Sequence, residues 1–215
     1  MPVWQSIYDE LKDQNIEFIL AAQDTGGKAA ADKFYEDAKV TYTAIIDVNH
    51  TISSLYNFVN VPSGAWIDEE GKIVRINEGT YAAKHLGGRI GTDEYVPAIR
   101  DWVAKGAASK FVWNAEKVAE KIKKRSPDHE KAEPAFKLGN HFHTLGNNDK
   151  ALVYWAMARE LNPDNINYMR QDLSFTEEGS SGATFRAKRE EFQSKGKAYY
   201  EDLELEAEAT TEKSQ

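Results

Sequence analysis

The chain has 215 residues, of which 41% are hydrophobic and 29% charged, so its composition is that of one or two soluble globular domains. Acidic residues outnumber basic ones by 35 to 27, and the net charge of −8 argues against binding to nucleic acid or to anionic membranes, whose phosphates would repel it. No apolar run approaches the ~20 residues of a membrane span, and the absence of cysteine excludes disulfides, thiolate zinc sites and cysteine nucleophiles.

The start of the chain alternates between helical and extended patterns. Pro2 can open a helix, because its missing N–H would be unpaired there, and an apolar stripe follows at helical spacing: Trp4, Ile7, Tyr8 and Leu11. Residues 16–22 are a nearly continuous apolar run, which predicts a buried strand. A break at Gly26–Gly27 precedes an alanine-rich helix over residues 28–39, and a second strand is expected at residues 43–47.

A β-hairpin is predicted next, after a short helix that carries Leu55, Tyr56 and Val59. Two apolar segments, residues 64–68 and 72–76, flank a short loop that contains Gly71, which is the pattern of a hairpin. Residues 77–91 are glycine-rich and irregular, and a helix is expected to begin near Thr92 as its N-cap. The alternation of helices and strands predicts an α/β fold with a mixed sheet.

The pattern changes after about Lys105, where strand-forming segments stop and helical ones continue. A helix is expected over residues 116–124, ending before Pro127. The last fifteen residues contain six acids and one lysine, so a disordered acidic tail is expected there. The predicted parts are an α/β domain, a helical domain and a tail, at residues 1–105, 106–200 and 201–215.

Residues 132–165 have the spacing of one tetratricopeptide repeat, a pair of antiparallel helices. The small residues Gly139 and Ala151 would let the two helices approach closely, while Phe142 and Trp155 fill the space beside them. One such pair cannot bury its own face, so the pattern predicts a helical hairpin rather than an array. The matching positions are Leu138, Gly139, Phe142, Ala151, Trp155, Ala158 and Pro163.

Three segments carry a resemblance to a known family. Residues 1–5, with the helix they open, and residues 18–24 look like the segment that follows a Cys-x-x-Cys motif. Asn60-Val61-Pro62-Ser63 precedes a strand, as a cis-proline segment would, and residues 66–74 resemble a terminal hairpin. In this order they resemble the thioredoxin superfamily, specifically the TlpA/ResA-like thiol–disulfide oxidoreductases and the redoxins of the AhpC/TSA type. The resemblance implies a three-layer thioredoxin-like fold over residues 1–105.

The chain departs from this family at the motif that carries its chemistry. In the family the reactive cysteines stand at the start of the first helix, where the helix dipole lowers the thiol pKa. Here the chain begins inside that helix, so the cysteines and the central strand before them would lie upstream of Met1. Two explanations are open: a longer native protein, which we favour, or a remnant that rearranges or forms a homodimer replacing the strand in trans. As written the chain would be cytoplasmic, but a missing N-terminus leaves its compartment open.

Val61 and Pro62 are the best candidate binding site, because the resemblance implies a cis peptide bond there and backbone pairing with a substrate. No catalytic residue is predicted without cysteine. His141 and His143 are two positions apart on a helix and point in opposite directions, so they cannot bind one ion together. The remaining histidines are isolated and expected in solvent or at helix caps: His50, His85 and His129. Neither a metal nor a cofactor is predicted.

Three functions are consistent with these patterns. The chain could be part of a thiol–disulfide oxidoreductase or redoxin whose catalytic motif lies outside it, and it would then be redox-inactive as written. It could instead be a non-catalytic interaction protein whose tetratricopeptide-like helices bind a peptide or a helix. A fragment of a peroxiredoxin-type peroxidase is the third reading. The expected partner is a protein or peptide rather than nucleic acid or a membrane.

Overall fold

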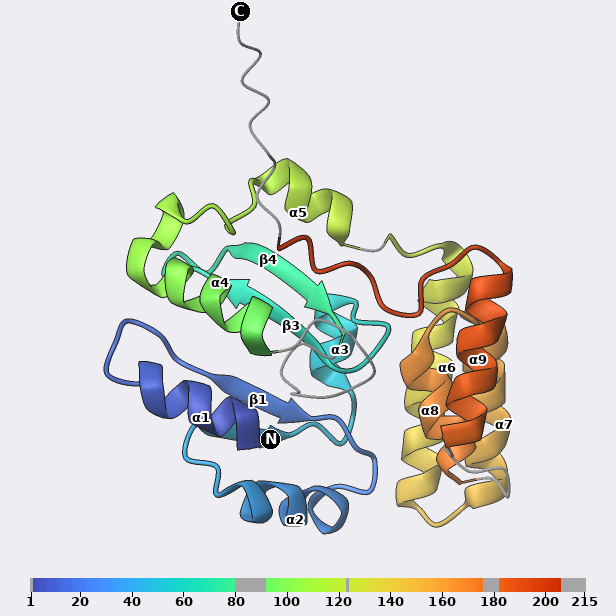
Figure 1. Ribbon diagram of the computed structural model, residues 1–215. Helices are drawn as coiled ribbons and strands as arrows, with labels where there is room; N and C mark the ends of the chain where they lie inside the picture. The colour runs from blue at the N-terminus through green and yellow to red at the C-terminus, as the bar shows by residue number, and fades with distance from the viewer. Residues whose placement is uncertain (1, 80–91, 123, 176–181, 206–215) are drawn as a thin grey trace, which may run out of the picture.

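The computed structural model describes residues 2–79, 92–122, 124–175 and 182–205, which form an α/β part and a helical part packed side by side (Figure 1). The α/β part contains α1 Pro2–Leu11, β1 Ile19–Ala22, α2 Lys28–Ala38, β2 Thr43–Ile46, α3 Thr51–Tyr56, β3 Ser63–Ile67, β4 Ile73–Glu78 and α4 Thr92–Lys105. After the short 3-10 helix η1 Gly106–Ala108 come α5 Ala115–Lys121, α6 Pro127–Thr144, α7 Asn148–Leu161, α8 Ile166–Ser174 and α9 Gly182–Ser194.

Local residues explain where several helices begin and end. Asn114 caps α5 by accepting a hydrogen bond from the Lys117 N–H at 2.9 Å. Pro127 opens α6 rather than only ending the helix before it, and Ser126 caps this helix through its hydroxyl. Lys39 ends α2 in the left-handed conformation.

The strands do not form the single mixed sheet that the sequence predicts. β1 pairs in parallel with β2, and β3 pairs antiparallel with β4, and these are two separate two-stranded sheets. The predicted hairpin is present as β3 and β4. No hydrogen-bonded ladder joins β1 to β3 among the described residues.

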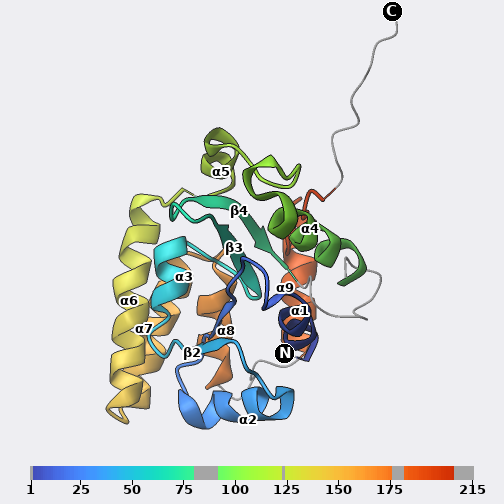
Figure 2. The ribbon, with the colours of Figure 1, turned by 90° about the vertical axis from the view of Figure 1, so that its left-hand side faces the viewer.

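One apolar core lies between α1, α4 and the β3–β4 hairpin. Figure 2 shows these helices on one side of the strands and α3 on the other. Ile7 and Leu11 from α1 pack with Trp66 of β3 and with Tyr95 and Ile99 of α4 in one buried cluster. The Trp66 indole N–H donates to the Tyr95 hydroxyl at 2.7 Å, which satisfies both polar groups inside the core.

The helical part has two further cores. Ala151, Trp155 and Ala158 of α7 are buried against α6, and Ile166, Met169, Leu173 and Phe192 hold α8 to α9. None of the described helices combines the length and the hydropathy that crossing a membrane requires.

The end of the helical part contradicts the prediction of a disordered tail from residue 201. Residues 199–205, here the C-terminal segment, return from α9 to the α/β part and run beside β4 (Figure 1). Leu203 is only 4% exposed and belongs to the main core, because its side chain reaches Trp66 and α4 across the hairpin. The acidic composition of residues 201–215 hides this apolar anchor. Residues 206–215 lie outside the described part of the chain.

Candidate functional site

The peptide bond between Val61 and Pro62 is cis, and the polar backbone groups around it are already engaged within the chain. The Val61 N–H donates to the Asn60 side-chain carbonyl at 2.9 Å, and the Val61 carbonyl accepts from the Tyr200 hydroxyl at 3.1 Å. The Pro62 carbonyl accepts from the Gly79 N–H at 2.9 Å. A substrate backbone could pair with Val61 only after displacing these intramolecular bonds. The predicted binding role of Val61 and Pro62 stays a prediction.

The C-terminal segment holds this loop at a second point. The Asn60 side-chain amide, 1% exposed, donates to the Tyr199 carbonyl at 2.8 Å. Tyr200 also packs on Gly79, where an added Cβ would lie 3.5 Å from the tyrosine Cβ. The two adjacent tyrosines therefore fasten the helical part to the Val61–Pro62 loop. No local sequence pattern indicates this role, because the partners of the two tyrosines lie about 139 residues earlier in the chain.

Arg75 of β4 is fully buried and fixes the rest of the C-terminal segment. Its guanidinium lies 4.3 Å from the ring centroid of Trp113 and 5.5 Å from that of Trp66. It donates hydrogen bonds to the backbone carbonyls of Leu203 and, at 2.9 Å, of Glu204. It also donates to the Phe111 carbonyl at 2.8 Å, between α4 and α5, and to the Asn77 side chain at 3.0 Å, in β4. These acceptors use the donors of the guanidinium, so Arg75 is a structural cation rather than a free binding group.

A polar cluster fills the interface between α3 and α6. Arg125 donates to the Ser54 carbonyl and to the Asn57 side chain at 3.1 Å, and it pairs with Glu133 at 2.7 Å. Lys137 also pairs with Glu133 at 2.8 Å, and hydrogen bonds from its neighbours hold the pKa of this carboxyl below its usual range although burial opposes them. The cavity beside the cluster measures about 20 Å³, which is the space of one water molecule. It is too small for an organic ligand.

His50 is buried in the same interface, contrary to the expectation that it lies in solvent or caps a helix. It stands before α3, but its side chain makes no capping hydrogen bond. The ring contacts Phe136, with centroids 4.9 Å apart, and its Nε2 lies 3.1 Å from the Thr25 hydroxyl. Burial lowers the pKa of His50 to about 4, so the ring is neutral at pH 7.

The other described histidines all lie on α6. His129 is half-buried, His141 is exposed, and His143 lies 3.1 Å from the Asn148 side chain. His85 lies outside the described residues. Within the described ranges, no group of three or more histidine, aspartate or glutamate side chains is placed to hold an ion.

The α6–α7 hairpin uses most of the positions that the repeat spacing singled out. Gly139 lies directly against Trp155, and a Cβ at position 139 would be 2.3 Å from the indole Cδ1. Ala151 and Ala158 are fully buried in the same interface. Pro163 follows the end of α7. Leu138 differs, with 41% exposure, because it precedes Gly139 by 100° of helical turn and faces away from the interface.

Apolar side chains also meet on the outer side of this hairpin. Phe142 of α6 stacks on Tyr154 of α7, with ring centroids 5.4 Å apart and planes inclined by 13°. Leu138 stands one turn before Phe142, and Met157 three residues after Tyr154, so each is a helical neighbour of the stack. Leu138 and Met157 are 41% and 43% exposed. We call these four residues, Leu138, Phe142, Tyr154 and Met157, the outer strip.

No family model, curated protein or solved structure matches this chain. The geometry of the described residues is therefore the support for a function. It offers two features beyond ordinary packing: the outer strip and the unpaired edges of β1 and β3.

Proposed function

We propose that the chain is a non-catalytic protein-interaction protein that binds a protein or peptide partner through the outer strip. Residues 1–105 would serve as a platform with a thioredoxin-like fold and no redox activity. The outer strip is the observation that carries this proposal.

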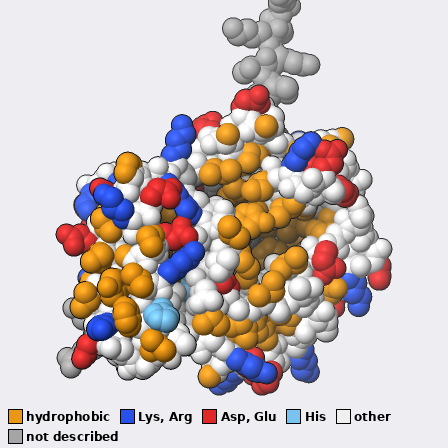
Figure 3. All heavy atoms as spheres, turned by 180° about the vertical axis from the view of Figure 1, so that it is seen from behind, with side chains coloured by type: hydrophobic (Ala, Val, Ile, Leu, Met, Phe, Trp, Pro, Cys, Tyr) orange, Lys and Arg blue, Asp and Glu red, His pale blue; other side chains and the backbone are white. Residues whose placement is uncertain are grey.

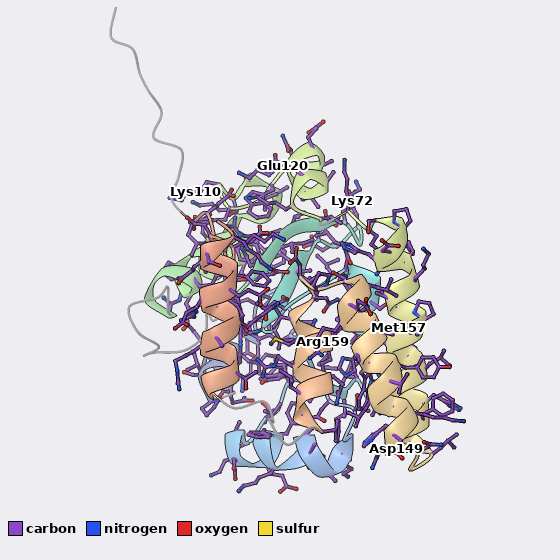
Figure 4. All side chains as sticks on the ribbon, turned by 90° about the vertical axis from the view of Figure 1, so that its right-hand side faces the viewer. Lys72, Lys110, Glu120, Asp149, Met157 and Arg159 are labelled. Carbon is purple, nitrogen blue, oxygen red and sulfur yellow. The ribbon has the colours of Figure 1, made fainter. Side chains whose placement is uncertain are left out.

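The strip has the properties of a helix-binding surface. Its members come from the antiparallel helices α6 and α7, and the Phe142–Tyr154 stack bridges the two helices. The Lys150 ammonium lies 5.1 Å from the Phe142 ring centroid, so one cation borders the stack. Large exposed apolar groups that adjoin one another are the usual mark of a partner surface, whereas single ones are common everywhere. Figure 4 labels Met157 on α7 where this helix lies alongside α6. An amphipathic helix laid along the hairpin would cover Leu138 and Met157 together.

The redox chemistry of the resembling family has no nucleophile in this chain. The sequence contains no cysteine, and thiol–disulfide exchange requires a thiolate. The backbone of Val61 is also hydrogen-bonded to Asn60 and Tyr200. An insulin-reduction assay on the 215-residue chain is expected to give the background rate. A rate above background would contradict the non-catalytic proposal.

Site-specific photocrosslinking in the source cells tests the binding surface. A benzoylphenylalanine at position 157 should capture a defined partner, identified by mass spectrometry, while the same group at the exposed position Glu190 of α9 should not. Leu138→Glu, which changes an exposed member of the outer strip, should lower the yield at position 157 about tenfold without changing the unfolding temperature. Equal products at both positions, or a yield unaffected by Leu138→Glu, would refute the outer strip as the binding surface.

A further inference from the structure

The space between β1 and β3 is bordered on both sides by backbone N–H and carbonyl groups that point into it. In the parallel pair, the Ala22 carbonyl accepts from the Asp47 N–H at 2.8 Å, so Ala22 faces β2. Backbone polar groups alternate in direction along a strand, and Ala21 therefore directs its N–H and carbonyl away from β2. In the hairpin, the Pro62 carbonyl accepts from the Gly79 N–H, so the backbone of Pro62 faces the strand of β4. Ser63 and Ala65 lie one and three residues later, so their N–H and carbonyl groups point away from β4.

The two open edges face each other with opposite strand directions. Figure 1 places β3 between β4 and β1, and the arrows of β1 and β3 point in opposite directions there. One strand inserted between them would run parallel to one of them and antiparallel to the other. Asn15, before β1, donates to Glu69, in the turn after β3, at 2.6 Å, which joins the two sides at one end of the space.

The two strands that border this space carry no charged residue and are mostly apolar. β1 has the sequence Ile-Leu-Ala-Ala and β3 has Ser-Gly-Ala-Trp-Ile. An apolar run like β1 is typical of a strand buried on both faces, yet Ile19 is 66% exposed and Ile67 is 42% exposed. Because β1 and β3 run in opposite directions, Ile19 at the start of one and Ile67 at the end of the other stand at the same end of the space.

Helices cover one face of the space, and the other face is exposed. α1 and α4 meet in a single core with Trp66 on the first face. Figure 3, which views the molecule from the opposite side, shows hydrophobic side chains gathered around a hollow in the α/β part. A guest strand would therefore gain a core on one face and would cover exposed apolar groups on the other.

We infer that this space binds one extended apolar segment of a partner polypeptide, about five residues long, as the missing middle strand. The segment would receive main-chain hydrogen bonds from both edges, at Ala21 on one side and at Ser63 and Ala65 on the other. The lengths of β1 and β3, four and five residues, set the length of the segment. Their lack of charge requires an uncharged apolar core in it. This site is separate from the outer strip and does not depend on it.

A neutral synthetic peptide provides the probe: Lys-Val-Leu-Val-Ala-Val-Glu, labelled at its N-terminus with an uncharged BODIPY fluorophore and blocked at its C-terminus. Its balanced charge prevents the net charge of −8 from driving binding. The matched control is the same peptide with an N-methyl group on the central valine, which removes one main-chain donor and keeps every side chain. Fluorescence anisotropy should show saturable binding of the first peptide and at least tenfold weaker binding of the second.

Protein variants and amide exchange locate the bound peptide. Ala65→Pro removes an N–H that points into the space while the ladder to β4 stays, and it should weaken binding about tenfold. Met157→Glu, in the outer strip, should leave it unchanged, which separates this inference from the proposed function. Hydrogen exchange at the amides of Ala21 and Ala65 should slow at least tenfold on adding the peptide, a readout that does not require the proline variant to fold.

Three results would overturn the inference. Equal binding of the N-methylated peptide would show contact without strand pairing. Unchanged exchange at both Ala21 and Ala65 would place the peptide elsewhere. A sedimentation measurement that finds a dimer with these amides already protected would show that a second copy of the chain, rather than a partner segment, fills the space.

Discussion

Replacing Gly139 by alanine sets two physical effects against each other in the α6–α7 hairpin. Alanine is the better helix former, by about 1 kcal/mol in a helix interior, so propensity alone predicts a more stable protein. The structure predicts the opposite, because the new Cβ would lie 2.3 Å from Trp155 Cδ1 and 2.4 Å from its Nε1. Contacts this short do not occur, so one of the two helices or the indole has to move.

The indole has little freedom to move away. Trp155 is 1% exposed, its Nε1–H donates to the Asn140 side chain at 2.8 Å, and its ring stacks on Phe175 at 5.2 Å. Overpacking of a close-packed core costs typically about 1–3 kcal/mol, and an overlap this deep belongs at or above the upper end. After subtracting the gain in propensity, Gly139→Ala should destabilise the protein by about 2 kcal/mol. For a chain of this size that lowers the unfolding temperature by about 4–8 °C.

A double-mutant cycle measured by thermal and urea unfolding checks the cause. In the background of Trp155→Ala the indole is gone, and Gly139→Ala should then be neutral or stabilising by up to about 1 kcal/mol. A coupling energy near zero, or an unfolding temperature that rises in the single variant, would refute the close approach of the two helices at Gly139.

Three further predictions concern the interface between the two parts. Arg75→Leu should lower the free energy of unfolding in urea by about 3–5 kcal/mol, because it leaves the Phe111, Leu203 and Glu204 carbonyls unsatisfied. Arg75→Lys should recover only part of this loss, and an unchanged free energy of unfolding for Arg75→Leu would contradict the structural role of Arg75. The pKa of His50 lies at about 4 in the folded protein and near 6.5 when unfolded, so the unfolded chain binds this proton more tightly. Stability should therefore fall by about 3 kcal/mol as the pH drops from about 6.5 to below 4, and His50→Gln should remove this slope in pH-dependent unfolding. Tyr200→Phe should cost about 1 kcal/mol by removing the hydrogen bond to the Val61 carbonyl, and an unchanged unfolding free energy would show that this bond is not formed in solution.

The elements that sequence patterns predicted well are those specified by local residues. The β3–β4 hairpin follows from two apolar runs around Gly71, and the contact of Gly139 with Trp155 follows from helical spacing. In each case the partners lie within about twenty residues, and the residue types themselves encode the turn or the close approach.

The features that were missed depend on contacts between distant segments. Arg75 looks like an exposed charge on a strand, but Leu203 and Glu204, almost 130 residues later, bury it. Leu203 sits in an acidic stretch whose average composition predicts disorder. His50 has no sequence neighbour that foretells burial, which comes from Phe136 of α6. The division of the strands into two sheets also depends on what lies between β1 and β3, which no local pattern specifies.

Because the C-terminal segment returns to the α/β part, the boundary near Lys105 does not divide the molecule into two independent units. The polypeptide leaves the α/β part once, through residues 106–126, and comes back to it through residues 199–205, so the two parts are tied together at two places. A protease cut between α5 and α6 would therefore leave both fragments associated through Leu203 and Tyr200. Residues 1–105 expressed alone would lack the carbonyls that Arg75 binds. The boundary separates two kinds of secondary structure, while melting is expected to proceed as one cooperative transition.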